Sequence, residues 1–257
     1  MKTSIIICTY NEANTIFNVV AACCKHNPDA EVIVVDDGST DETESILETL
    51  AMHHDFVYLK LKGNKGQSYA MAYGVEYASG EVILFFNADV SGLRKEHFTQ
   101  MLQPIYNEVA DLVIGTPSGV TIDYTSNPYK SVIGQKAMLK SDLMPILNDI
   151  REIRFSVENF IMLHYQTNGK RVHFSALDGL RFAFHSSEID NFSEIKAENN
   201  LEVANALLSN IDLITKRVQN NIQLTQNYTK STITSVQYDL NRRMKILKER
   251  ISELELA

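Results

Sequence analysis

The 257-residue sequence predicts an α/β protein with an open, mostly parallel sheet and a helical extension at its C-terminus. Short apolar segments rich in β-branched residues alternate with segments whose apolar residues recur at helical spacing. The strand-like segments are nearly continuous in apolar character, which is typical of strands covered by helices on both faces. Regular alternation of strand and helix implies right-handed crossovers and therefore parallel strands.

The strand-like segments of the first half lie at residues 4–9, 31–37, 56–61, 81–87 and 111–116. The helix-like segments between them lie at residues 13–26, 41–54, 65–78 and 94–108. Ser39-Thr40-Asp41-Glu42 has the pattern of a capping box, which predicts a helix start directly after the second strand. Gly74 falls inside the third helix, where glycine costs stability relative to alanine, so we expect close packing there.

The alternation ends near residue 118. A long loop is expected next, followed by helices near 140–150 and 156–168 and a strand at 170–177. After residue 192 the sequence predicts helix again. A stripe of apolar residues at steps of three and four marks one face of the last helix: Ile233, Val236, Leu240, Met244, Leu247, Ile251 and Leu254.

Composition limits the class of protein. Hydrophobic residues make up 44% of the chain and charged residues 22%, as in soluble globular proteins, and no apolar run is long enough to span a bilayer. The N-terminus lacks the extended apolar region of a signal peptide, so the cytoplasm is the expected location. A net charge of -8 argues against a general nucleic-acid binder. Cys8, Cys23 and Cys24 have no metal-ligand spacing and are expected to be reduced.

Polar residues follow three of the predicted strands. Thr9, Tyr10, Asn11 and Glu12 follow the first, Asp36 and Asp37 the second, and Asn87-Ala88-Asp89 the fourth. Any one of these groups could simply form a turn. Ligands of open α/β sheets bind beyond the carboxyl ends of the strands, however, and three polar ends at that edge favour a ligand site. In an extended segment Asn87 and Asp89 point to the same side and Ala88 points away.

The segments SIIICTYNEANTI, EVIVVDDGSTDET and NKGQSYAMAYGVEYASGEVILFFNAD resemble successive signatures of family 2 glycosyltransferases. The resemblance covers residues 3–116 and extends more weakly to about residue 185. It implies a Rossmann-like sheet of the GT-A type, in a domain spanning residues 1–190. Residues 1–116 would bind the nucleotide sugar, residues 117–190 would form the acceptor side, and residues 191–257 would form the helical extension.

The same resemblance implies a reaction and a donor site. A sugar would move, with inversion, from a nucleotide-sugar donor, a UDP-sugar being favoured, to a lipid-linked or cell-envelope glycan precursor. Thr9, Tyr10 and Glu12 would hold the nucleobase and ribose, and Asp37 would hydrogen-bond the edge of a uracil-like base. Asn87-Ala88-Asp89 would stand at the D-x-D motif, which holds Mn²⁺ or Mg²⁺ against the pyrophosphate.

The metal would neutralise charge on the departing nucleoside diphosphate, and Asp89 offers it a carboxylate ligand. Asn87 stands where the family usually has Asp. Its amide can bond ribose hydroxyls but is a weaker metal ligand. A degenerate site that binds nucleotide sugars without turnover is therefore the non-enzymatic alternative.

Further residues complete the expected site. Lys65, beside a turn glycine at the start of the third helix, is expected to face an anionic ligand, although it could be an ordinary exposed lysine. Glu158 is the predicted general base for the acceptor hydroxyl, with a simple charge in the first helical turn as the alternative. The resemblance further implies that Arg181 contacts the pyrophosphate and His185 the metal, with purely structural roles as the alternative.

Two other enzyme classes fit less well. A sugar-phosphate nucleotidyltransferase would need a Gly-rich, basic loop after the first strand, and a Rossmann dehydrogenase would need G-x-G-x-x-G after a strand. Neither pattern occurs.

The apolar stripe of the last helix needs a partner, which could be another subunit, the body of the same chain or a membrane surface. Basic and acidic residues beside the stripe favour helix pairing over binding to anionic lipid. We therefore expect a homo-oligomer formed through the C-terminal helix, with peripheral contact at the inner face of the membrane as the alternative.

Overall fold

The computed structural model describes residues 1–118, 134–153, 157–182, 201–224 and 230–256. Its contacts divide the chain into two compact units. The first comprises Met1–Val120, Ile133–Arg154 and Arg171–Ser186, and the second comprises Thr121–Val132, Phe155–Lys170 and Ser187–Ala257. The predicted domain boundary at residue 190 lies outside the described residues.

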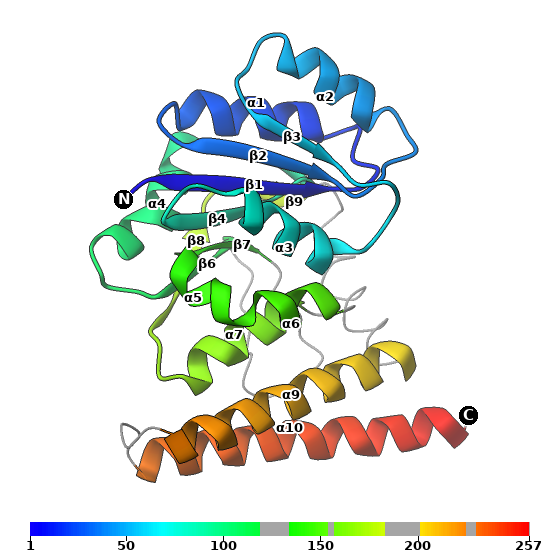
Figure 1. Cartoon of the computed structure of the whole chain (residues 1–257), viewed down its shortest axis with the longest axis vertical. Helices are drawn as coiled ribbons and strands as arrows, with labels where there is room; N and C mark the ends of the chain where they lie inside the picture. The colour runs from blue at the N-terminus through cyan, green and yellow to red at the C-terminus, as the bar shows by residue number, and fades with distance from the viewer. Residues whose placement is uncertain (119–133, 154–156, 183–200, 225–229, 257) are drawn as a thin grey trace. The chain divides into compact units, whose positions relative to one another are not determined.

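A seven-stranded sheet forms the centre of the first unit, in the order β3-β2-β1-β4-β7-β6-β8 (Figure 1). Only β7 within this sheet runs antiparallel to its neighbours, β4 and β6. The strands are β1 (Thr3–Thr9), β2 (Glu31–Asp36), β3 (Val57–Lys60), β4 (Val82–Asn87), β6 (Leu112–Pro117), β7 (Gln135–Leu139) and β8 (Val172–Leu177). The predicted α/β class and mostly parallel sheet are confirmed. Two short strands that were not predicted, β5 (Val90–Ser91) and β9 (Arg181–Phe182), pair antiparallel in a separate sheet.

Helices cover both faces of the large sheet. On one face, α1 (Ile16–His26), α2 (Thr43–Ala51) and α4 (Lys95–Tyr106) share a hydrophobic cluster with the strands. On the other face lies α3 (Gln67–Tyr77), which packs against α6 (Leu147–Glu152). Two short helices, α5 (Lys140–Leu143) and η1 (Met144–Ile146), connect β7 to α6.

Gly74 is buried in α3 at its contact with the sheet. A Cβ atom at this position would lie 2.6 Å from Cγ2 of Ile6 and 3.2 Å from Cγ2 of Val35. Such contacts leave no room for a side chain, so the close packing predicted for this glycine is confirmed.

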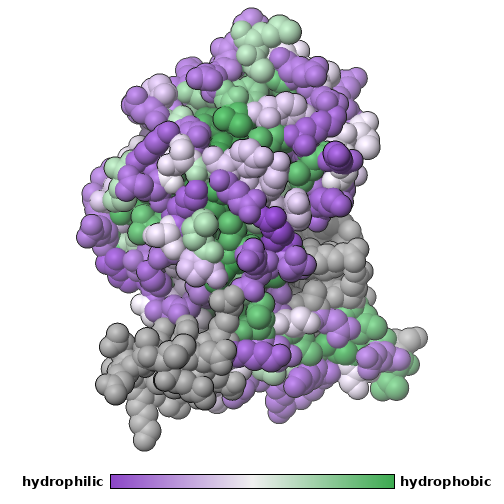
Figure 2. Space-filling model, in the orientation of Figure 1, coloured by the Kyte–Doolittle hydropathy of each residue, from purple (hydrophilic) through white to green (hydrophobic). Residues whose placement is uncertain are grey.

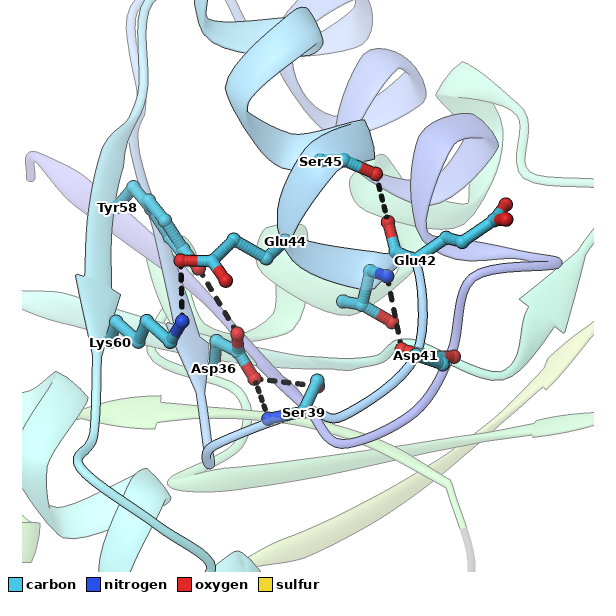
Figure 3. A network of polar contacts seen from close by, with 9 residues as sticks. Asp36, Ser39, Asp41, Glu42, Glu44, Ser45, Tyr58 and Lys60 are labelled. Atoms are coloured by element: carbon cyan, nitrogen blue, oxygen red, sulfur yellow. Dashed lines mark hydrogen bonds and ion pairs between the residues drawn. The ribbon is translucent and has the colours of Figure 1, made fainter.

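The predicted capping box is wrong, because α2 begins at Thr43 and has no side-chain cap hydrogen bond. Ser39 instead turns back to the end of β2, where its amide and hydroxyl donate to Oδ1 of Asp36 at 2.8 and 2.6 Å (Figure 3). The hydroxyl of Tyr58 donates to Oδ2 of Asp36 at 3.0 Å. Burial, and then the charge of Asp36, raise the pKa of Tyr58, which keeps this donor protonated. Asp36 therefore ties the turn after β2 to β3.

The second unit contains α7 (Val157–Thr167), α9 (Leu201–Leu224) and α10 (Lys230–Leu256). α9 packs against both α7 and α10, and Leu240 and Leu247 of α10 are buried. The helical extension is confirmed, and α9 supplies cover for this part of the apolar stripe within the same chain. The side chains of Ile233 and Val236 lie outside the described part.

One face of the described residues can be seen in the space-filling view (Figure 2). Figure 2 shows polar residues over most of the visible face, with apolar residues in small areas between them. Among the described helices, none combines the length and apolar character needed to cross a bilayer.

Candidate active site at the carboxyl edge of the sheet

The strand order brings the predicted polar ends together. β1 lies between β2 and β4, and in this register Thr9 is opposite Asp36 while Cys8 is opposite Asn87. From β1 the chain first adds β2 and β3 on one side of β1, and then adds β4 on its other side. This reversal of strand order makes the edge a topological switch point. Open α/β sheets form their ligand crevice at such a point.

Hydrogen bonds join the loop after β1 to the turn after β2 and to the first residue of α2. The amide of Asn11 donates to the hydroxyl of Ser39 at 3.0 Å, and the amide of Glu12 donates to the hydroxyl of Thr43 at 2.9 Å. Asn11 has a φ of 57°, in the left-handed region that asparagine tolerates better than most residues. The loop that carries Tyr10 and Glu12 is thus held in place, while Tyr10 itself stays 42% exposed and open to a ligand.

Asp37 anchors the start of α3. Its two carboxylate oxygens accept hydrogen bonds from the amides of Lys65 and Gly66, both at 2.7 Å. Gly66 has a φ of 94°, which favours glycine at this position. Burial raises the pKa of Asp37, and the two amides partly offset this effect. Lys65 is exposed beside this junction.

The segment Asn87-Ala88-Asp89 alternates in burial. Ala88 and Val90 lie in the hydrophobic cluster, whereas Asn87 and Asp89 are only partly buried. This pattern agrees with the expectation that Asn87 and Asp89 share the side away from the cluster. The backbone amide of Asn87 donates a hydrogen bond to Oε1 of Gln135 at 2.6 Å.

The carboxylates of Glu12 and Asp89 lie close enough at this edge for the charge of Asp89 to affect Glu12. Burial raises the pKa of Asp89. Burial, and then the charge of Asp89, raise the pKa of Glu12, while a hydrogen bond from the hydroxyl of Thr15 at 3.2 Å opposes this. Both groups would gain from a cation between or beside them.

The donor set fits a hard divalent ion that relies on its substrate for further ligands. No group of three or more His, Cys, Asp or Glu side chains suited to a metal occurs among the described residues. Mg²⁺ commonly takes one or two carboxylates and completes its shell with phosphate oxygens and water. Asp89, with Glu12 as its neighbour, could hold such an ion only together with a phosphate ligand.

Two buried polar atoms at this edge have no hydrogen-bond partner within the described ranges: Oγ1 of Thr9 and Nε2 of Gln135. The sequence singled out Thr9 but not Gln135. A glutamine in a segment with no clear strand pattern carries no signal, and its importance depends on the antiparallel strand β7 that places it beside β4.

The remaining predicted site residues are Arg181, Glu158 and His185. Arg181 lies in β9 opposite Ser91 of β5, and β5 starts directly after Asp89. Arg181 is therefore close in the fold to the predicted metal segment. Glu158 is in the first turn of α7, in the second unit. His185 lies outside the described residues.

Two residues not singled out by the sequence position the segment before β9. The ring of buried His97 accepts the Arg94 amide at Nδ1, at 3.3 Å, so its Nε2 carries the proton and donates to the carbonyl oxygen of Asp178 at 2.9 Å. The guanidinium of Arg94 donates to the same oxygen. These contacts hold the turn that leads to Arg181.

The fold, with its polar strand ends at one edge of a mostly parallel sheet, defines an open α/β protein, and comparison with known families identifies its family. Residues 4–177, more than half of the chain, match the family described as Glycosyl transferase family 2. The chain therefore belongs to this family.

Individual relatives match over smaller parts or at low identity. Poly-beta-1,6-N-acetyl-D-glucosamine synthase of Staphylococcus epidermidis is 31% identical over 87 residues, which are 34% of this chain and 21% of that protein. Residues 1–349 of TarS from S. aureus have a similar fold, with a TM-score of 0.65 and 20% identity over 95% of this chain and 71% of theirs.

A third similar structure is glucosyl-3-phosphoglycerate synthase from Mycobacterium tuberculosis in complex with Mn²⁺, UDP and phosphoglyceric acid. Its TM-score is 0.62 and its identity 17%, over 81% of this chain and 78% of that chain. The predicted GT-A fold is confirmed by these likenesses.

Proposed function

We propose that the protein transfers a sugar from a UDP-sugar to an acceptor, with Mn²⁺ or Mg²⁺ held at Asp89. The observation that carries the proposal is the partly buried Asp89 carboxylate at the switch point, with its raised pKa and the charge of Glu12 beside it. A cation bound with a nucleoside diphosphate would satisfy both carboxylates. The Mn²⁺ and UDP in the glucosyl-3-phosphoglycerate synthase complex support this choice of ligands.

Different residues at the edge of the sheet are proposed to bind the different parts of the donor. Tyr10 is exposed for contact with the nucleobase and ribose, with Thr9 before it at the end of β1 and Glu12 after it in the loop. Asp37 already accepts two amides, but each carboxylate oxygen has a further lone pair that could accept from a base edge. Lys65 and Arg181 supply positive charge for the pyrophosphate, and Asn87 supplies an amide for ribose hydroxyls.

The metal, when bound, would act as a Lewis acid that stabilises the leaving diphosphate. The chain's own residues would orient the donor and keep its pyrophosphate next to Asp89. His185 is proposed as a further metal ligand.

Transfer with inversion requires an acceptor hydroxyl to attack the sugar from the side opposite the leaving group. Glu158 is proposed as the general base that takes the proton of this hydroxyl. A phosphate acceptor on a lipid would need no base, because its nucleophilic oxygen is already ionised.

The acceptor is proposed to be a lipid-linked or cell-envelope glycan precursor. The name of the S. epidermidis synthase, which makes a polysaccharide, supports a glycan. We further propose a cytoplasmic protein that acts at the inner face of the membrane and forms a homo-oligomer through α10.

A protein that binds nucleotide sugars without turnover is a second candidate, because Asn87 replaces a carboxylate at the metal segment. Both candidates predict that a nucleotide sugar with Mn²⁺ raises the melting temperature, since a ligand bound by the native state stabilises it.

A panel of nucleotide sugars screened in this way would identify the donor, and an assay of donor hydrolysis would then separate the candidates. Release of UDP supports the enzyme, and tight binding with no UDP release supports the binding protein. No thermal response to any nucleotide sugar would contradict both.

A further inference from the structure

Gln135 is buried within the sheet at the point where β4 ends. Its exposed fraction is 0%, and its Oε1 accepts the Asn87 amide at 2.6 Å. The backbone pairing of β4 with β7 reaches Phe85, opposite Lys136. The Gln135 side chain thus supplies an acceptor to β4 beyond the last pair of this ladder.

The Asn87 contact determines which way the carboxamide points. An amide N–H can only donate, so the group nearest to it must be the oxygen of Gln135, and Nε2 must point elsewhere. That nitrogen is buried and has no partner among the described residues. An unpaired buried donor costs stability, whereas an apolar side chain of the same size would avoid the cost.

A costly side chain at this place suggests a benefit other than folding. Asn87 is the first residue of the segment that carries Asp89, so the position of its backbone affects where the Asp89 carboxylate lies. We infer that Gln135 is a positioning residue, which holds the Asn87 backbone so that Asp89 meets the metal and the diphosphate of the donor. This inference rests on the proposed function and assigns a role to a residue outside the predicted site.

The test uses the full chain and compares three variants. Gln135→Met keeps the approximate size and removes both polar atoms, and Gln135→Glu keeps an oxygen within reach of the Asn87 amide. Thr3→Val is the control. Thr3 is 4% exposed, its hydroxyl lies 2.5 Å from that of Tyr106, and it begins β1 at the opposite end of the strand. This control removes a partly buried hydrogen bond away from the site.

Two readouts separate a positioning role from a purely structural one. Without ligand, hydrogen exchange of the Asn87 amide should become faster in Gln135→Met but stay slow in Gln135→Glu and Thr3→Val. With Mn²⁺ present, calorimetry should show that Gln135→Met binds UDP about tenfold more weakly, the equivalent of one lost hydrogen bond, while Thr3→Val binds it as the wild type does.

Equal UDP affinity in Gln135→Met and the wild type would overturn the inference, even if exchange at Asn87 became faster. Failure of the proposed function has a different signature. In that case the wild-type chain itself would bind no UDP in the presence of Mn²⁺.

Discussion

At the scale of single residues, the candidate site combines groups that stabilise the fold with buried charged groups that lower its stability. Asp36 accepts three hydrogen bonds from Ser39 and Tyr58 and stabilises the turn after β2. Asp37 is buried and accepts hydrogen bonds from the two backbone amides that precede α3. By contrast, burial raises the pKa of Asp89, and burial, followed by the charge of Asp89, raises the pKa of Glu12. Their benefit should appear only when a cation binds.

Replacing Asp89 by asparagine should therefore stabilise the metal-free protein at neutral pH. Since the pKa of Asp89 is raised by folding, its favourable contribution is present below the ordinary pKa of about 4 and is lost as pH rises through the raised value. In EDTA, Asp89→Asn should melt above the wild type at pH 7, and the difference should disappear below about pH 4.

With UDP and Mn²⁺ this order should reverse, because only the wild type gains a metal. Melting curves across this pH range, with and without Mn²⁺, make the comparison. A wild type that is the more stable of the two at pH 7 in EDTA would show that the Asp89 charge is already compensated within the protein.

Asn87→Asp would restore the family residue and place another carboxylate beside Asp89. It should lower the stability of the metal-free protein and tighten Mn²⁺ binding by about tenfold, since affinity for hard cations rises with the number of charged ligands. Ser91→Asp is a suitable control, because Ser91 is exposed and lies just beyond the segment. If Mn²⁺ affinity, measured by calorimetry, rises equally in both variants, Asn87 is not adjacent to the ion.

At the scale of elements, sequence patterns identify structure where the elements are long and regular. The apolar strands and the helices between them could be predicted, because period and length distinguish them clearly. β7 could not be predicted, since it begins with two polar residues, Gln135 and Lys136, whose exposed fractions are only 0% and 4%. β5 and β9 contain two residues each and exist only through their mutual pairing. Ser39 was misassigned because Asp36 competes for its hydroxyl.

The same distinction applies to the site. Residues at the ends of predicted strands could be placed at one edge from topology alone. The role of Gln135 depends on a strand without a sequence signal. Arg94 and His97 position Asp178 through tertiary contacts, which the sequence does not show.

The contact of α3 with the sheet gives a test at this scale. Gly74→Ala would ordinarily stabilise a helix by about 1 kcal/mol. Here the added methyl group would meet Ile6 and Val35, so we expect a net destabilisation of about 1–2 kcal/mol in urea unfolding. Gly63→Ala is the control, since a Cβ there meets no atom within 4 Å, and it should change stability by less than about 0.5 kcal/mol. A stabilised Gly74→Ala variant would refute the close contact.

At the scale of the whole molecule, the chain places the predicted donor residues in one unit and the proposed base in the other. The donor edge is formed by β1, β2 and β4 of the first unit, whereas Glu158 belongs to the second with α9 and α10. Nucleotide binding should therefore depend on residues of the first unit.

Homo-oligomer formation through α10 can be tested without disturbing the α9 contact. Tyr238 is a large apolar residue of α10 that is 73% exposed, unlike Leu240 and Leu247, which are buried. Light scattering at micromolar concentration should find an oligomer for the wild type and a smaller species for Tyr238→Glu, with unchanged helix content by circular dichroism. A monomeric wild type would contradict the proposed oligomer, and its flotation with anionic liposomes would favour a membrane contact instead.

The most direct test of the central claim is the calorimetric titration of UDP into the wild-type chain, once with Mn²⁺ and once in EDTA. The claim is that Asp89, at the carboxyl edge of the sheet, binds a nucleoside diphosphate through a divalent ion. Binding should be at least about tenfold tighter with Mn²⁺, because the ion links the Asp89 carboxylate to the phosphates. Equal affinity in both conditions, or no binding in either, would contradict the claim.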